Sequence, residues 1–343
     1  MIEGHTRDSW TRLSDRDRDA YQWLNILSGI GAPIFLFLAG ISLSLAAGSR
    51  RRRGVPESDV GALAVRRGVM IFGLAFVFRL QSWIISGGRF PESLLKVDIL
   101  NVMGVSMVAA ALLWRLGWNP PARAAIFVAA TAAAAMVTPI VRASSSLAGL
   151  PDSIESYVQP LPGRASFTLL PWSAFLIGGT AVGMWLDSAR DPSRERQVNL
   201  ALLAMGLAIG VGSYSASLLP PLYPAVDFWT TSPTFFFLRL GILLAIVPIA
   251  YGVNLAIRGP RLEEFGRASL FVYWIHVELV YGVLSAPLHR RLPLEQVVVA
   301  FVTFSLFLFF LVRVKARVVA RIGAIRGVTG LRATTNALRR NKG

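Results

Sequence analysis

The sequence alternates between long runs of apolar residues and short polar breaks. Each run is close to the ~20 residues that an α-helix needs to cross the hydrocarbon core of a membrane. Hydropathy windows and the breaks between the runs predict nine spans, at about residues 24–47, 68–86, 97–116, 122–141, 166–186, 198–219, 233–257, 267–285 and 295–313. The pattern therefore predicts an all-α fold, a polytopic transmembrane helical bundle.

The run from Gly266 to Ser285 carries His276 and Glu278 in its interior. Ionisable side chains inside a spanning helix cost free energy unless they face a cavity, a partner or a substrate, so they mark functional sites by default. This run is therefore the first place to look for chemistry. The alternative is a buried hydrogen bond that locks two helices together and has no catalytic role.

Lysine and arginine gather in the loops on one side of the predicted spans. That side holds 23 of the 35 Lys and Arg residues, and the other side holds 10. Cytoplasmic loops keep the excess of positive charge, so the first side is predicted to be cytoplasmic. The chain then divides into an extracytoplasmic segment (1–23), a transmembrane domain (24–313) and a basic cytoplasmic tail (314–343). The tail is expected to lie as an amphipathic helix on anionic lipid.

This orientation places further polar residues at one depth. Arg79 falls in the outer half of the second span, and Asp98 and Asn101 fall in the first turns of the third. Arg239 lies in the outer part of the seventh span, at a depth similar to that of Glu278 in the eighth. Helix pairs would bring Arg79 to Asp98 and Arg239 to Glu278 and so neutralise buried charge. These pairs are candidates for substrate binding, and the alternative is that they are only salt bridges between helices.

Two other stretches suggest local roles. The Pro-containing stretch 142–165 is the longest predicted outer loop, and we expect it to form a lid or the rim of a substrate site. The aromatic residues 235–237 are predicted to face lipid or the membrane interface.

Composition excludes several classes of protein. With 54% apolar and 16% charged residues in 343 and a mean hydropathy of +0.55, the chain is too apolar for a soluble domain of this length. There is no cysteine and there are three histidines, so thiol catalysis is excluded and a metal site is not expected. The net charge of +16 lies in short loops between apolar runs, which favours a membrane surface over nucleic acid.

Polar residues are set within four apolar segments, which read GAPIFLFLAGISLSLAAG (31–48), KVDILNVMGVSMVAAALL (96–113), LLPWSAFLIGGTAVGMWL (169–186) and GRASLFVYWIHVELVYG (266–282). With these segments the chain resembles the heparan-alpha-glucosaminide N-acetyltransferase-like membrane acyltransferases over roughly residues 1–285. The resemblance implies a helical bundle whose acyltransferase-like domain moves an acetyl or acyl group from acetyl-CoA, the co-substrate on the cytoplasmic side. The acceptor on the other side would be sugar-like or lipid-linked.

The same resemblance assigns catalytic positions. The family's histidine after its first helix matches His5 in MIEGHTRD, its late histidine matches His276 in YWIHV, and its third-span aspartate matches Asp98. Acyl transfer needs a base for the acceptor's proton and a donor for the developing oxyanion. A neutral histidine suits the first role, and Arg79 or Arg239 suits the second.

The family has an apolar helix before its first histidine, whereas this sequence has four residues before His5. We therefore expect the natural protein to be longer, with a tenth helix upstream that returns its N-terminus to the cytoplasm. The expected location is the inner membrane of a bacterial cell, in contact with lipid, and self-association is left open.

Two other classes of function stay open at this point. Buried charge pairs around a midplane cavity also describe a transporter or flippase, which internal repeats and broken helices would favour. No convincing internal repeat is seen, and this leans toward the enzyme. A structural or assembly subunit is the third reading, and it predicts that replacing His276 changes stability alone.

Overall fold

A computed structural model describes residues 1–87, 89–117, 119–146, 149–256 and 261–340, with the side chains of residues 261–262 and 322–340 outside the description. Regular structure in these ranges is helical, apart from two isolated β-bridges that join Thr11 to Leu292 and Val97 to Ala165. The predicted all-α class is therefore confirmed.

The helices follow one another along the chain as α1 (Ile2–Trp10), the 3-10 helix η1 (Leu13–Asp15), α2 (Asp19–Ser28), α3 (Gly31–Arg52), α4 (Glu57–Ser86), α5 (Glu92–Leu95), α6 (Ile99–Leu116), α7 (Pro120–Ala143), α8 (Asp152–Glu155), α9 (Leu169–Ser188), α10 (Pro192–Ser217), α11 (Pro233–Ala256), α12 (Arg261–Arg267), α13 (Ser269–Tyr281), the 3-10 helix η2 (Val283–Ser285) and α14 (Leu294–Arg340).

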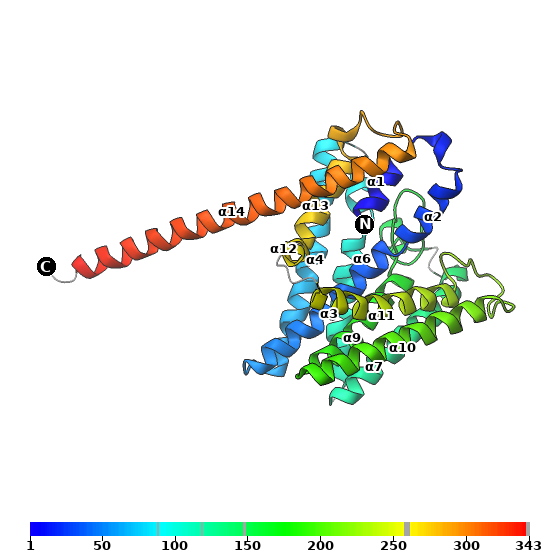
Figure 1. Ribbon diagram of the computed structural model, residues 1–343, viewed down its shortest axis with the longest axis horizontal. Coiled ribbons are helices and arrows are strands. Elements are labelled where there is room, and N and C mark those ends of the chain that lie inside the picture. The colour runs from blue at the N-terminus through cyan, green and yellow to red at the C-terminus, as the bar shows by residue number, and fades with distance from the viewer. Residues whose placement is uncertain (88, 118, 147–148, 257–260, 341–343) are drawn as a thin grey trace. The chain divides into compact units, whose positions relative to one another are not determined.

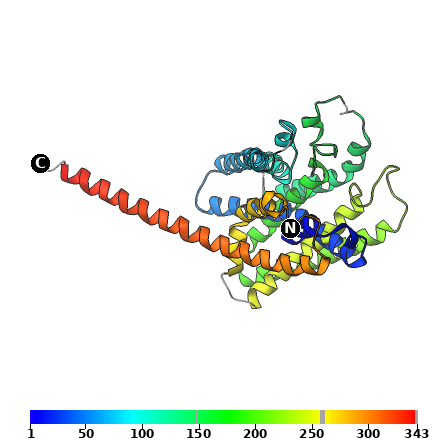
Figure 2. The ribbon, with the colours of Figure 1, turned by 90° about the horizontal axis from the view of Figure 1, so that it is seen from above.

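Eight helical stretches of the described residues are long and apolar enough to cross a membrane. The first joins α2 and α3 over 34 residues, and six of the others coincide with α4, α6, α7, α9, α10 and α11. The eighth is the first 28 residues of α14, a single helix that runs on through the predicted basic tail to Arg340. Its length is clear from two directions (Figure 1; Figure 2). The protein is thus a multi-pass helical membrane protein.

The predicted span at residues 267–285 contains a shorter helix. Helix α13 has 13 residues, which is about 20 Å at 1.5 Å per residue, less than the ~30 Å of the hydrocarbon core. It ends because Gly282 takes an extended conformation and the chain then turns into η2. The polar pair in this run therefore lies in a short helix and not in a full span.

Side-chain caps start several of the long helices. Asn119 accepts a hydrogen bond of 2.8 Å from the backbone N–H of Ala122 at the start of α7, and Asp191 accepts one of 2.9 Å from that of Arg194 at the start of α10. Each cap is followed by proline in the first turn, where the missing N–H costs nothing. These loop residues therefore fix where the spans begin.

The chain forms two compact units. We call Met1–Asn25 together with Gly259–Gly343 the terminal unit, and Ile26–Arg258 the central unit.

In the terminal unit, the N-terminal segment is bound to the end of the chain by backbone hydrogen bonds. The N–H of Arg12 donates to the carbonyl of Leu292 over 2.9 Å, and the N–H of Leu292 donates to the carbonyl of Trp10 over 2.9 Å. Trp10 also packs in a small core with Val280 and Val297. The segment 1–23, predicted to be extracytoplasmic, is therefore a folded part of this unit.

In the central unit, glycines allow α3 and α9 to touch. A Cβ added at Gly179 would collide with the carbonyl oxygen of Phe37, and one at Gly40 would collide with that of Leu176. Glycine thus replaces side-chain volume with backbone contact, as small residues do between membrane helices. Helices α10 and α11 form a second close pair, and they run side by side (Figure 1).

Candidate functional site

Two of the three predicted catalytic residues meet in the terminal unit. Helix α1 carries His5 and α13 carries His276, and the centroids of the two imidazole rings lie 5.2 Å apart at an interplanar angle of 48°. His276 is 2% exposed. Residues separated by 271 positions are thus brought together, as their shared assignment to one site requires.

The hydrogen bond of His276 fixes its tautomer. Its Nδ1 lies 2.7 Å from the carbonyl oxygen of Val272, one turn earlier in α13. A carbonyl oxygen only accepts, so Nδ1 carries the proton, and the Nε2 of the neutral ring keeps its lone pair. This Nε2 is buried and has no hydrogen-bond partner within the described part of the chain. It is an unprotonated nitrogen in an apolar helix, which is the form a general base needs.

His5 belongs to a chain of hydrogen bonds with two other side chains. The hydroxyl of Tyr281 donates to Oδ2 of Asp8 over 3.0 Å, so its oxygen is left to accept the bond from Nδ1 of His5, also 3.0 Å long. Asp8 therefore orients Tyr281, which orients the imidazole of His5. Sequence reasoning did not assign Asp8 or Tyr281 to the site, because 273 residues separate them.

Further contacts hold α1 in this position. The side chains of Ser9 and Trp10 both donate to the carbonyl oxygen of Val280, over 2.9 Å and 3.3 Å. Arg7 is buried, donates to Glu3 and Asn25 over 3.1 Å each, and has its guanidinium over the ring of Tyr21. The helix that presents His5 is thus bound on two sides.

The expected pair of Arg79 and Asp98 forms in the central unit. The guanidinium of Arg79, on α4, donates to Oδ2 of Asp98 over 2.6 Å. Asp98 is the N-cap of α6, where its Oδ1 accepts from the N–H of Ile99, and its own N–H donates to Oδ1 of Asn101 over 2.9 Å. Both carboxylate oxygens of Asp98 are therefore engaged.

Asn101 connects this cap to the outer loop. Its side-chain amide donates to the hydroxyl of Tyr157 over 3.3 Å, and burial raises the pKa of that hydroxyl. Near the same helix start, burial lowers the pKa of Lys96, and the positive charge of Arg79 lowers it further. The loop is also bound to the chain before α6 by the bridge between Val97 and Ala165. Tyr157 and Ala165 of the stretch 142–165 are therefore tied to the start of α6, beside the Arg79–Asp98 pair.

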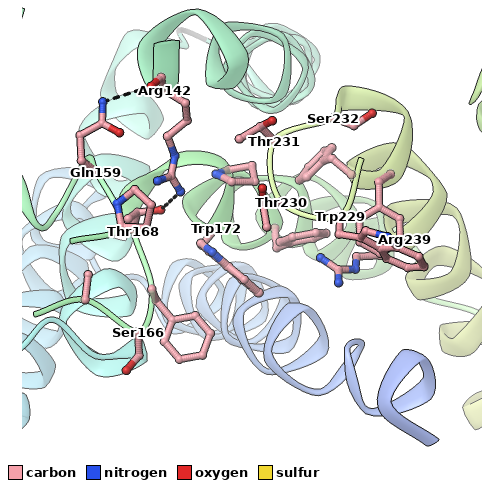
Figure 3. Close-up of a pocket in the computed structure, with 17 residues that line it drawn as sticks. Arg142, Gln159, Ser166, Thr168, Trp172, Trp229, Thr230, Thr231, Ser232 and Arg239 are labelled. Carbon is pink, nitrogen blue, oxygen red and sulfur yellow. Dashed lines mark hydrogen bonds between the residues drawn. The ribbon is translucent and has the colours of Figure 1, made fainter. Parts of the chain in front are cut away.

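Arg239 lines a cavity of about 320 Å³ in the central unit. Its guanidinium lies 3.8 Å from the centroid of the Phe235 ring. Figure 3 shows Arg142 and Arg239 on opposite sides of Trp172. The prediction that residues 235–237 face lipid is wrong for Phe235 and Phe236, which are buried. Glu278 belongs to the terminal unit, so its pairing with Arg239 stays a prediction.

A comparison with protein families matches residues 1–218 of the chain to the model described as "Heparan-alpha-glucosaminide N-acetyltransferase, catalytic". That range is more than half of the 343 residues. The chain belongs to this family. It is therefore a multi-pass membrane protein of an acetyltransferase family. No curated protein matches the chain.

The match to the heparan-alpha-glucosaminide N-acetyltransferase family covers α1 to α10 and includes His5, Arg79, Asp98 and Asn101. His276, Arg239 and Glu278 lie beyond the matched residues. The partner of His5 is thus supplied by a helix outside the match.

Sequence reasoning missed Arg142 and the aromatic residues of the cavity. Arg142 was counted as a loop residue, whereas it lies in the last turn of α7. Gln159 donates to the carbonyl of Val141 over 3.1 Å, which fixes the loop to the end of this helix. The available signal was a lone arginine at the end of an Ala-rich span, followed by a loop with prolines.

Proposed function

We propose that this protein transfers an acetyl group from acetyl-CoA, bound from the cytoplasmic face, to a hydroxyl or amine of a sugar-like acceptor on the opposite side of the membrane. His276 acts as the base. The observation that carries the proposal is the buried Nε2 of His276. This nitrogen keeps a lone pair because Nδ1 donates to the carbonyl of Val272. The imidazole ring of His276 lies beside that of His5.

Nε2 of His276 takes the proton of the acceptor's O–H or N–H as the acceptor atom bonds to the acetyl carbon. The C–S bond of acetyl-CoA then breaks, and the CoA sulfur takes the proton from the imidazolium. The histidine is thereby restored, as in general acid–base catalysis.

His5 and Asp98 have different parts in this proposal. His5 is held by Tyr281 and Asp8, so its ring presents a fixed surface next to His276. Asp98 belongs to the central unit and holds the guanidinium of Arg79. Its part is structural, because this pair joins α4 to the start of α6.

Activity of the full chain in detergent tests the role of His276. Turnover is measured as acetyl-CoA consumed in the presence of glucosamine, and folding is measured by melting temperature on the same preparation. His276→Ala and His276→Gln are expected to lose at least about 100-fold in turnover, the usual share of a general base, with an unchanged melting temperature. His289→Gln is the matched control, because His289 is exposed and its ring forms a hydrogen bond with the hydroxyl of Ser9.

Two outcomes would count against this role. Full activity in His276→Gln would remove the residue from the mechanism. Equal loss of activity and of folding in both variants would favour a histidine that only locks helices together.

The proposed orientation has a test of its own. The chain has no native cysteine, so single cysteines report without background. Arg53→Cys should resist a membrane-impermeant thiol reagent in intact bacterial cells, and Ile154→Cys, on an exposed position of the outer loop, should react. Reversed labelling would place the loop, with the cavity that it lines, on the cytoplasmic side.

A further inference from the structure

The cavity that contains Arg239 is built by segments from five parts of the central unit. The end of α7 supplies Arg142, the loop before α9 supplies Gln159 and residues 165–168, the start of α9 supplies Trp172 and Phe175, the loop before α11 supplies residues 229–232, and α11 supplies Arg239. Its volume of about 320 Å³ is at the lower end of the ~300–1,000 Å³ of small-molecule sites. The cavity is thus of a size for one small ligand.

The two arginines of the cavity lack carboxylate partners. Arg142 donates to two neutral oxygens, Oγ1 of Thr168 over 2.6 Å and the carbonyl of Leu170 over 3.3 Å, and its Nε is buried without a hydrogen-bond partner. Arg239 stacks on Phe235. Across the described residues, neither arginine forms an ion pair. Arg79, in the same unit, does.

Half-buried cations without counter-ions are costly, because their desolvation is not repaid by a nearby negative charge. The guanidinium group presents a planar fork of donors that fits a carboxylate or a phosphate. The acidic residue nearest in sequence to the cavity loop is Asp227, which accepts from the hydroxyl and the N–H of Thr230 and is not part of the cavity lining. No carboxylate of the described central unit lines the cavity, so an anionic ligand could supply the negative charge that these two arginines lack there.

The rest of the lining describes the body of that ligand. Trp172 and Trp229 offer flat apolar surfaces, and hydroxyl groups come from Thr230, Thr231 and Ser232 (Figure 3). A sugar ring has an apolar face of C–H groups, which packs on an indole, and a rim of hydroxyls, which exchange hydrogen bonds with Ser and Thr. These hydroxyls already bond to Asp227 and Thr234 within the protein, and their oxygens can still accept hydrogen bonds from the hydroxyls of a sugar.

We propose that this cavity binds a sugar that carries a carboxylate or phosphate group, with Arg142 and Arg239 on the anion and Trp172 against the ring. The claim that this sugar is also the acceptor of the acetyl transfer rests on the function proposed above. The binding itself does not depend on that function.

Calorimetry on the full chain in detergent tests the proposal with four probes. D-glucuronate and glucose 6-phosphate carry a ring and an anion, D-glucose carries only the ring, and inorganic phosphate only the anion. We expect both anionic sugars to bind more tightly than glucose by roughly 10- to 100-fold, the worth of one charged hydrogen-bonded contact, and more tightly than phosphate. If glucose bound as tightly as the anionic sugars, the proposed recognition of an anionic group would be wrong. If phosphate bound as tightly, the proposed recognition of a sugar ring would be wrong.

Variants then place the binding in this cavity. Arg239→Gln and Arg142→Gln should each weaken glucuronate by about tenfold or more, while Arg194→Gln, on an exposed turn at the start of α10, should bind as the parent does. Trp172→Phe keeps an aromatic ring and should weaken the binding of both anionic sugars. The factor should be similar for the two sugars and smaller than in the arginine variants. Undiminished binding in both arginine variants would place the site elsewhere and sink the proposal.

His276→Gln separates this inference from the proposed function. If this variant binds glucuronate normally and has lost acetyl transfer, both proposals hold. If the parent binds glucuronate but acetylates no sugar, the binding site stands and the proposed acceptor class fails.

Discussion

His276 in the terminal unit and Asp98 in the central unit are both ionisable residues buried in apolar surroundings, 2% and 7% exposed, but their functional atoms differ. Asp98 has both carboxylate oxygens engaged, by Arg79 and by the N–H of Ile99. His276 keeps one ring nitrogen without a partner in the described residues. Burial of charge therefore does not by itself separate structure from chemistry, whereas the state of the reactive atom does.

The same contrast appears between the arginines of the central unit. Arg79 neutralises Asp98, whereas Arg142 and Arg239 have only neutral neighbours among the described contacts. We interpret the first as a helix connector and the other two as ligand-binding groups.

Breaking the Arg79–Asp98 pair should have the largest effect on stability. Asp98→Ala leaves a buried guanidinium without its counter-ion, which costs about 3–5 kcal/mol in the free energy of unfolding. The double variant Arg79→Met with Asp98→Ala should recover part of this loss, since no unpaired charge is left. Denaturation of the full chain in detergent measures both values.

The surface pair of Arg267 and Glu263, whose side chains are 82% and 60% exposed, is the matched control. Arg267→Ala should cost no more than about 1 kcal/mol. If Asp98→Ala lost all activity at unchanged stability, Asp98 would be part of the chemistry and the comparison with His276 would fail.

Removing the hydroxyl of Tyr281 should have an intermediate effect on turnover. Tyr281→Phe breaks the connection between Asp8 and His5 and keeps the ring, so we expect turnover to fall by about threefold to tenfold, the worth of one neutral hydrogen bond. The melting temperature should change little. Tyr214→Phe, at an exposed position of α10, is the control. Unchanged turnover in Tyr281→Phe would show that His5 needs no such orientation.

The smallest expected effect is a pH dependence at the base of the terminal unit. Asp15 accepts hydrogen bonds from the N–H of Leu294 and from Arg12, 2.9 Å each, and these bonds hold the pKa of its carboxyl below the ordinary 3.8, the first more strongly than the second. Because the folded pKa is depressed, the stabilisation is present at neutral pH, above the ordinary value, and is lost as pH falls through the folded pKa.

Melting temperature measured from neutral pH down to about pH 3, around the ordinary range of aspartate, tests this. The parent should lose stability at the acid end, and Asp15→Asn should start lower and lose less. Asp17→Asn, at an exposed neighbouring position, should follow the parent. An Asp15→Asn curve parallel to that of the parent would exclude Asp15 as the cause.

Local pattern was enough for eight of the nine predicted spans, and it overestimated the one at 267–285, which holds the short α13. Hydropathy adds up over a window of neighbouring residues, so the apolar runs and the depth of Arg79 relative to Asp98 follow from sequence order alone. Arg79 lies on α4 and Asp98 at the start of α6, and these two helices are consecutive long spans in the chain. This is why their pairing was predicted and is found. The family was also visible in residues set within those runs.

The tertiary structure decided which distant residues meet and which apolar residues face protein. Hydropathy measures how apolar Phe235 and Phe236 are, but not whether lipid or protein covers them, and here protein does. Likewise, nothing local marks Asp8 and Tyr281 as partners of His5, because their contact exists only once α1 binds the carbonyl of Val280 some 270 residues away. The tautomer of His276 and the unpaired arginines of the cavity are decided at this level, because each depends on the neighbours that folding brings within hydrogen-bond distance.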